Sequence, residues 1–204
     1  MPFAKPFAAS LIALAVAGSA IAQKATPNGP RHDGAEVATD LPPEIRVRNT
    51  VGTDGAGLCV WASTEMMARY LNVEGLVGIF EALQSEPGGG WPERVDREMQ
   101  KRAPGVKYRQ YLGGDLDFIR EGIDSGRPVC VTYGYGEFYG SRTIAHMVLC
   151  VAMDDRYTGI LDNNDPEHIW WMSTDEFRKR FGWPSGQGWA WYTLAPPPPP
   201  PPHN

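Results

Sequence analysis

The hydrophobic period of this sequence changes once, at about Pro128, and that change limits the folds open to the chain. Before it, apolar residues recur at helical spacing, which predicts helices near 59–72, 75–85, 91–103 and 115–126. After it, apolar runs between turn residues predict strands at 128–134, 144–155, 157–163, 168–172 and 188–195. A capping-box pattern adds a short helix at 174–181. Helices followed by antiparallel strands indicate an α+β fold rather than alternating βαβ units.

Length and composition favour one folded domain with tails. The chain has 204 residues, of which 42% are hydrophobic and 11% aromatic, enough for a substantial core and too many for a disordered chain. The formal net charge of −5 gives no electrostatic reason to expect nucleic acid or an anionic membrane as a partner.

The N-terminus has the features of a secretory signal peptide. Lys5 precedes an apolar stretch at 7–17, and Ala20-Ile21-Ala22 stands directly before Gln23. The alternative is a membrane anchor, but the apolar stretch is shorter than the ~20 residues that a spanning helix needs. We therefore expect cleavage near Ala22, and a periplasmic or secreted mature protein without a membrane segment.

The segments that flank the predicted domain are polar or rich in proline. Residues 23–44 are expected to form a flexible leader, which places the folded domain at 45–195. The tail at 196–204 contains seven consecutive prolines and predicts an extended polyproline II segment. That tail could dock in an aromatic groove or serve as a solvated spacer.

The chain has three cysteines, Cys59, Cys130 and Cys150, so an exported form has at least one unpaired thiol within the chain. Cys130 and Cys150 lie in predicted strands and could form a disulfide, or both could be reduced and buried. Because no C-x-x-C occurs, the spacing of a zinc knuckle or a thioredoxin-type redox site is missing. We expect no metal and no cofactor.

Cys59 stands in the stretch GAGLCVWAS, between glycines and the start of a predicted helix. Free N–H groups and the helix dipole stabilise a thiolate at such a position, and the thiolate is the nucleophilic form of cysteine. The glycines allow close approach of a substrate and can turn N–H groups toward an oxyanion. This setting predicts a catalytic nucleophile.

A thiolate nucleophile needs a proton carrier, usually histidine. His32 and His203 lie in the leader and the tail, and His168 is expected at a strand edge, whereas His146 opens the longest apolar strand. The stretch LDNND at 161–165 ends the return strand, so the hairpin brings its polar residues beside His146. A plain turn and a buried core histidine are the alternative interpretations.

These motifs, in this order, resemble the papain-like cysteine peptidase superfamily. GLCVWAS, AHMVLCVAMDD and ILDNNDP carry the resemblance, and LDFIREGIDSGRPVCVTYG and WWMSTDEFRKRF are similar to its compact bacterial branch, which includes bacteriocin leader peptidases. The likeness covers most of 50–194. It implies a helical N-terminal part, with the cysteine at a helix start, on a C-terminal antiparallel sheet.

The resemblance also implies roles for individual residues. Cys59 would be the nucleophile, His146 the general base and acid, and Asn163 the residue that orients the histidine, with Asp162 as the alternative. Asp165, before Pro166, is a further candidate. Asn163 is preferred because it follows directly on the apolar strand residues GILD, 159–162.

Two features depart from the family pattern. Cys59 and His146 are 87 residues apart, fewer than the ~130–150 of papain-type enzymes. The family usually has a glutamine in the oxyanion hole six residues before the cysteine, where this chain has Thr53. Asn49 could supply that donor instead.

The predicted function is that of an exported thiol hydrolase, which cleaves an amide bond of a peptide or protein substrate through an acyl-enzyme on Cys59. An amidase for cell-wall peptides is one alternative. A catalytically inactive papain-like module that binds peptides is the other, and Thr53 favours it.

Overall fold

The computed structural model describes residues 23–25, 39, 41–49, 58–86, 89–134 and 146–199. The predicted signal peptide, most of the predicted leader, Thr53 with the glycines before Cys59, and the end of the proline tail lie outside the described residues, as do His32 and His203. In the described part of the chain, no helix is long and apolar enough to cross a bilayer.

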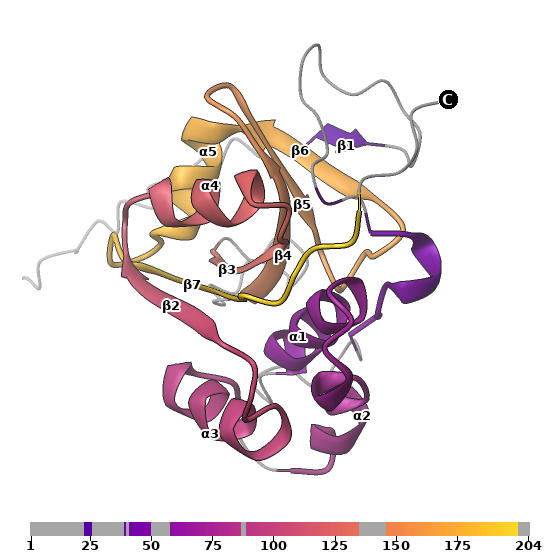
Figure 1. Cartoon of the computed structure of the whole chain (residues 1–204). Coiled ribbons are helices and arrows are strands. Elements are labelled where there is room, and N and C mark those ends of the chain that lie inside the picture. Colours follow the sequence, from indigo (N-terminus) through magenta and orange to yellow (C-terminus); the bar gives the residue numbers. More distant parts are fainter. Residues whose placement is uncertain are drawn as a thin grey trace, which may run out of the picture.

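A seven-stranded antiparallel sheet forms the centre of the molecule, with the strand order β1-β6-β5-β4-β3-β7-β2 (Figure 1). Every residue of the middle strand β4 is buried. The strands are β1 Gln23–Ala25, β2 Tyr108–Gly113, β3 Val129–Tyr133, β4 His146–Met153, β5 Tyr157–Leu161, β6 Ile169–Ser173 and β7 Gly188–Thr193.

Helices cover this sheet on both faces. The helix α1 contacts β4 and β3, α4 contacts β4, β3 and β7, and α5 contacts β3, β6 and β5. Helices α1, α2 and α3 lie together at one side of the molecule, in the lower part of Figure 1. The helices are α1 Leu58–Tyr70, α2 Ile79–Leu83, α3 Pro92–Arg102, α4 Asp117–Asp124 and α5 Thr174–Phe181, with 3₁₀ turns η1 Pro43–Ile45 and η2 Glu74–Leu76.

The local signals in the sequence explain where several helices begin and end. Pro92 occupies the first turn of α3, where its missing N–H costs nothing. The Ser173 hydroxyl accepts a hydrogen bond from the Glu176 N–H and caps α5. Gly126 follows α4 with φ +77°, a conformation that favours glycine. The predicted α+β class is confirmed.

Strand β2 was not predicted, because its sequence YRQYLG has neither an apolar run nor a clear alternation. It pairs with β7 along its whole length. Side-chain contacts hold it as well: Gln110 donates to Asp96 and accepts from the Trp189 indole, and the Tyr108 hydroxyl donates to Asp96. Tertiary partners, rather than local propensity, therefore make this segment a strand.

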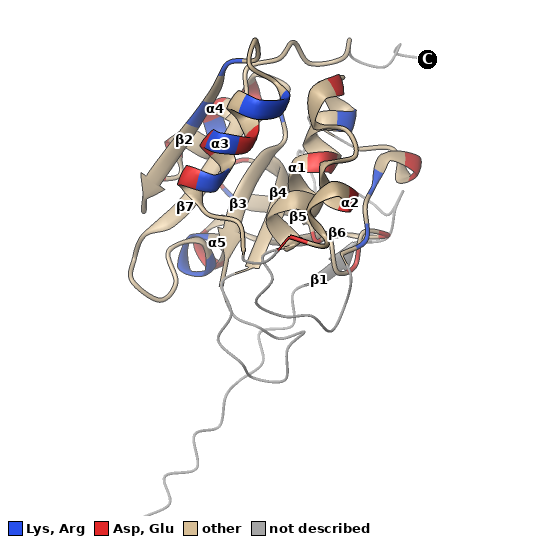
Figure 2. Cartoon of the chain, turned by 90° about the horizontal axis from the view of Figure 1, so that it is seen from below, with Lys and Arg blue, Asp and Glu red and all other residues tan. Residues whose placement is uncertain are grey.

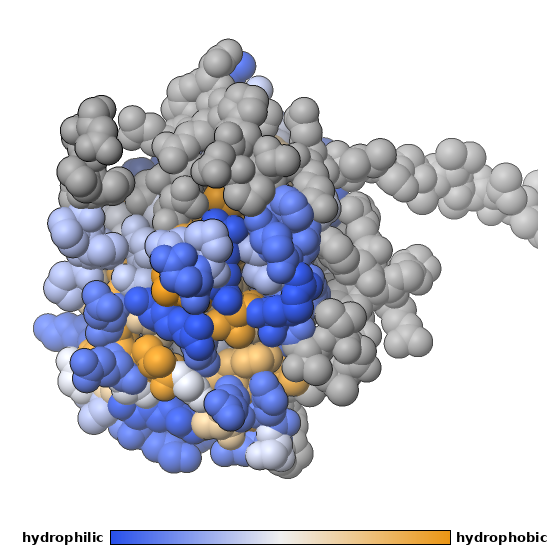
Figure 3. All heavy atoms as spheres, turned by 90° about the vertical axis from the view of Figure 1, so that its right-hand side faces the viewer, coloured by the Kyte–Doolittle hydropathy of each residue, from blue (hydrophilic) through white to orange (hydrophobic). Residues whose placement is uncertain are grey.

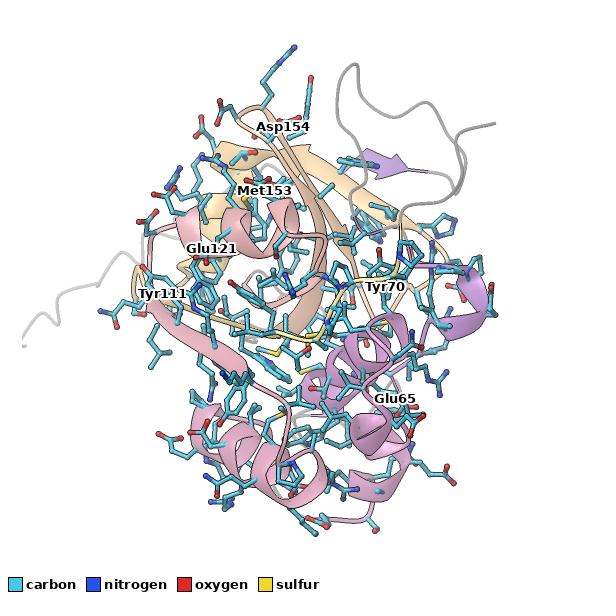
Figure 4. The ribbon with its side chains drawn as sticks, in the orientation of Figure 1. Glu65, Tyr70, Tyr111, Glu121, Met153 and Asp154 are labelled. Carbon is cyan, nitrogen blue, oxygen red and sulfur yellow. The ribbon has the colours of Figure 1, made fainter. Side chains whose placement is uncertain are left out.

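Helix α1 is fixed at its middle by a buried carboxylate. Glu65 is only 3% exposed, and its Oε2 accepts a hydrogen bond of 2.9 Å from the backbone N–H of Phe80 in α2. Its other oxygen pairs with Arg69, one turn further along α1. Figure 4 shows Glu65 on α1, on the side of α2. The bond to Phe80 ties α1 to α2, and the pair with Arg69 lies within α1.

The packed chain begins earlier than residue 45. Thr39 and Leu41, which fall within the predicted leader, are buried, and β1 adds a strand beside β6. On the surface, both signs of charge are interspersed, for instance along α3 (Figure 2). The face shown in Figure 3 is mostly hydrophilic, with small hydrophobic areas between.

Cys130 and Cys150 are fully buried as free thiols. Val129 lies opposite Cys150 across the β3–β4 ladder, so these two side chains share a face of the sheet. Cys130 follows Val129 and therefore points to the other face. The disulfide considered from the sequence is thus excluded in this fold, and the reduced alternative holds.

We expect one rapidly reacting thiol in the native protein and three after unfolding without reductant. Burial raises the pKa of Cys130 well above its ordinary value and that of Cys150 to about 12, so neither forms the reactive thiolate near neutral pH. Titration with an aromatic disulfide reagent, before and after adding guanidinium chloride, measures both counts. Only one thiol in the unfolded chain would show that the other two are bonded.

Candidate active site

Cys59 is the second residue of α1 and is partly exposed. The first turn of a helix has N–H groups that its own ladder does not use. Here, hydrogen bonding from the backbone of Val60 and, from strand β4, of Met147 lowers the pKa of the Cys59 thiol. The thiol therefore lies where α1 meets the start of β4.

His146 is the first residue of β4 and is 5% exposed. Its Nε2 lies 2.8 Å from Oδ1 of Asp162, which is 2% exposed. The carboxylate accepts this hydrogen bond, so Nε2 carries the proton. Nδ1 is then the ring nitrogen left for Cys59, whose side chain hydrogen bonds with that of His146.

The two reactive groups shift each other's pKa. Burial by itself would raise the pKa of Cys59, but the hydrogen bond and charge of His146, with the two backbone N–H groups, lower it below its ordinary value. Burial would lower the pKa of His146, but the charge and hydrogen bond of Asp162, and then those of Cys59, raise it to about 10. Both shifts favour the ionised thiol beside the protonated imidazole.

Strands β4 and β5 contain a β-bulge between Cys150 and Ala152, which shifts their register by one residue. Val151 is the extra residue. Its carbonyl accepts hydrogen bonds from both the N–H and the hydroxyl of Thr39, at 3.3 Å and 2.8 Å. A residue of the predicted leader thus holds the bulge.

This bulge decides which residue after β5 faces His146. Leu149 lies opposite Leu161, so the continued ladder puts Asp162 on the same face of the sheet as His146. Without the extra residue, Asn163 would take that place. The expectation that Asn163 contacts His146 is therefore corrected in favour of Asp162.

Asn163 lies in the same cluster but has other partners. Its Nδ2 lies 3.1 Å from the Cys59 carbonyl, 2.9 Å from the Ser63 hydroxyl and 2.7 Å from the Met147 carbonyl. Ser63 was not identified from the sequence, and Asn164 was expected near His146 only as part of the stretch 161–165. Ser63 is four residues after Cys59 and so on the same side of the helix, a signal that could have found it.

Asn164 lies at the edge of the site. Its side-chain nitrogen is 3.3 Å from Nε2 of His146, and its backbone N–H donates to Asp162. Asn49, the suggested oxyanion donor, donates its side-chain N–H to Asn164 Oδ1 at 3.2 Å. The amide of Asn49 thus contacts the loop after β5.

The other charged side chains of this loop have partners away from His146. Asp165 contacts Nδ1 of His168 at 3.1 Å, and Glu167 forms an exposed ion pair with Arg48. Of the described residues, Asp165, Glu167 and His168 are the group whose ligand atoms lie close enough together to hold a metal ion. The Asp165–His168 pair and the pairing of Glu167 with Arg48 account for the cluster.

A cavity of about 620 Å³ lies at the far end of α1 from Cys59. Its lining comes from the turn after α1, the segment after α3 and the residues after β7: Leu71–Gly75, Ala103–Lys107 and Leu194–Pro196. None of the site residues lines it, so its volume says nothing about the chemistry at Cys59.

The site combines a cysteine at a helix start with a histidine that begins a central strand and hydrogen bonds to an aspartate. This arrangement on an α+β fold is similar to that of papain-like proteins. A solved structure from Bacillus anthracis, a presumed C39-like peptidase, superimposes with a TM-score of 0.53. It is 12% identical in sequence, and the match covers 76% of this chain and 98% of that one. The likeness shows the papain-like fold.

Neither a protein-family model nor a curated protein matches the sequence.

Proposed function

We propose that this protein is an exported cysteine peptidase that cleaves an amide bond through an acyl-enzyme on Cys59. The observation that best supports this proposal is His146 itself. Asp162 holds its Nε2 at 2.8 Å, and the hydrogen bond and charge of His146 lower the pKa of the Cys59 thiol. A lowered thiol pKa beside a raised imidazole pKa gives a nucleophile and a general acid at the same pH.

In the first half of the reaction, the Cys59 thiolate attacks the carbonyl carbon of the scissile amide. The carbonyl oxygen becomes an oxyanion. Because the Asn49 amide donates to Asn164 instead, we propose the backbone N–H of Cys59, in the first turn of α1, as the donor to this oxyanion. His146 gives its proton from Nδ1 to the leaving amine, the C–N bond breaks, and a thioester remains.

In the second half, neutral His146 takes a proton from a water molecule, which attacks the thioester. Collapse of this intermediate releases the acid and returns the sulfur as thiolate, with His146 protonated again. Asp162 holds the imidazole in one orientation and stabilises its charged form throughout, which is the role of the third group in such sites.

Export, the substrate class and the partners are proposed from the sequence. The pattern at 1–22 supports export to the periplasm or medium, and the likeness to the compact bacterial branch supports a peptide or protein substrate. The net charge of −5 disfavours nucleic acid as a partner. The proline tail at 196–202 is a candidate docking segment.

A peptide-binding module without activity is the second candidate, and Thr53 at the position of the family's glutamine is the observation that favours it. An amidase for cell-wall peptides differs from a peptidase only in its substrate.

We expect the purified protein to cleave members of a peptide library or muropeptides, with hydrolysis lost in Cys59→Ala. Mass spectrometry of the products identifies the broken bond and separates peptidase from amidase. Cys130→Ala is the matched control, since this thiol lies in β3 away from the site, and it should retain hydrolysis. Peptide binding without cleavage would favour the inactive peptide-binding module. Cleavage by Cys59→Ala would show that the reaction does not pass through an acyl-enzyme on Cys59.

A further inference from the structure

We infer that Asn163 is a positioning residue, which fixes the helix that carries Cys59 against the strand that carries His146. This role differs from the orienting of the imidazole, which Asp162 performs. It rests on the proposed function, because it concerns the geometry of the same thiol–imidazole pair.

The contacts of Asn163 join two elements through one group. Its side-chain NH₂ bonds to the carbonyl of Cys59 in α1, at 3.1 Å, and to the carbonyl of Met147 in β4, at 2.7 Å. The first carbonyl belongs to the nucleophile itself, and the second to the residue after His146. A shift of α1 along β4 would therefore break at least one of these bonds.

Ser63 completes the same cluster. Its hydroxyl accepts from the Asn163 NH₂ at 2.9 Å and donates to the Met147 carbonyl at 3.2 Å. Asn163 and Ser63 are both fully buried, so no water competes for these bonds. Buried hydrogen bonds of this kind fix one arrangement of the elements that they join.

The chemistry of the position calls for a donor. All three partners of the NH₂ group act as acceptors, so a carboxylate oxygen in its place would face two carbonyl oxygens. The Asn163 Oδ1, by contrast, is buried without a hydrogen-bond partner among the described residues, which is unfavourable. The amide is thus held by its nitrogen end.

The backbone of Asn163 is fixed as well. Its carbonyl accepts a hydrogen bond of 2.7 Å from the N–H of Asn49, in the segment that leads toward Cys59. Two consecutive residues therefore have different roles. Asp162 hydrogen bonds to the imidazole of His146, and Asn163 hydrogen bonds to the backbone that sets the distance between His146 and Cys59.

The pH profile of Cys59 alkylation by iodoacetamide tests this role. In Asn163→Ala and Asn163→Asp, we expect the apparent pKa of Cys59 to rise toward that of an ordinary thiol, near 8.5, and the rate at pH 6 to fall about tenfold or more. Phe177→Leu, a substitution in the buried part of α5, controls for lost stability and should leave the profile unchanged.

A folded Asn163→Ala protein with the profile of the unmodified protein and only a lower melting temperature would overturn the inference. If neither Asn163 variant folds, NMR on the ¹⁵N-labelled protein decides. The side-chain amide protons of Asn163 must then exchange slowly and change their chemical shifts when Cys59 is alkylated, and fast exchange or unchanged shifts would overturn the inference. If the unmodified protein itself had the alkylation pH profile of an ordinary thiol, that result would instead count against the proposed function.

Discussion

Replacing His146 by alanine is expected to slow alkylation of Cys59 at pH 6 by about tenfold or more, because the thiolate loses its charged partner. The imidazolium hydrogen bond and charge lower the pKa of Cys59, and burial opposes them. Without the histidine, the pKa should return to or above that of a free thiol, near 8.5, which is only about 0.3% ionised at pH 6. The rate of iodoacetamide labelling from pH 4 to 10 gives the apparent pKa in each protein.

His168→Ala is the matched control, because this histidine pairs with Asp165 and should leave the profile of Cys59 unchanged. Cys130 and Cys150 are buried and should contribute only a slow background. If His146→Ala and the unmodified protein gave the same labelling profile, Cys59 and His146 would not form a thiolate–imidazolium pair, and the proposed mechanism would be wrong.

The second large effect is expected for Asp162→Ala. Loss of the carboxylate frees the imidazole to turn and removes the charge that favours its protonated form. We expect kcat to fall by roughly 10⁴-fold, the loss seen when the aspartate of a Ser-His-Asp site is replaced by asparagine. The measurement is turnover of a cleaved peptide as a function of pH.

The pH dependence should change in a definite direction. The pair is active while His146 is protonated, so activity falls as the pH rises through the pKa of His146, which is about 10. Asp162 raises this pKa, and its removal should therefore move the alkaline limb of the profile toward the ordinary histidine value of about 6.5. The pH range in which Asp162→Ala is active should therefore end at a lower pH than that of the unmodified protein.

Asp165→Ala provides the comparison for Asp162→Ala. It removes a carboxylate from the same loop, but one that contacts His168. Its kcat should stay close to that of the unmodified protein, because the partly buried Asp165–His168 pair does not include His146. Equal losses in both variants would mean that the loop as a whole, rather than Asp162, supports the histidine.

Much of the fold follows from local patterns in the chain. The change from helical to strand period near Pro128 predicts α+β, and Pro92 and Ser173 mark helix starts that the structure has. Strand β2 could not be found in this way, since Gln110 and Tyr108 are held by side chains distant in sequence. Long-range partners leave no periodic signal.

For the cysteines too, the sequence predicts one part of the result and the tertiary structure decides the other. Their odd number follows from the sequence, but the pairing of Cys130 with Cys150 depends on which face of the sheet each side chain takes. That face follows from the β3–β4 register, which places Val129, and not Cys130, opposite Cys150. Proximity of two strands is therefore not enough to predict a disulfide.

The sequence by itself determined that a thiol at a helix start and a histidine at the start of an apolar strand belong together, because each residue stands at an identifiable element boundary. Only the tertiary structure decided that Asp162, and not Asn163, completes them. One extra residue at Val151, held by Thr39, shifts the β4–β5 ladder by one position. Because side chains alternate along a strand, that single shift exchanges the two neighbours: the carboxylate faces the imidazole, and the amide joins the helix to the strand.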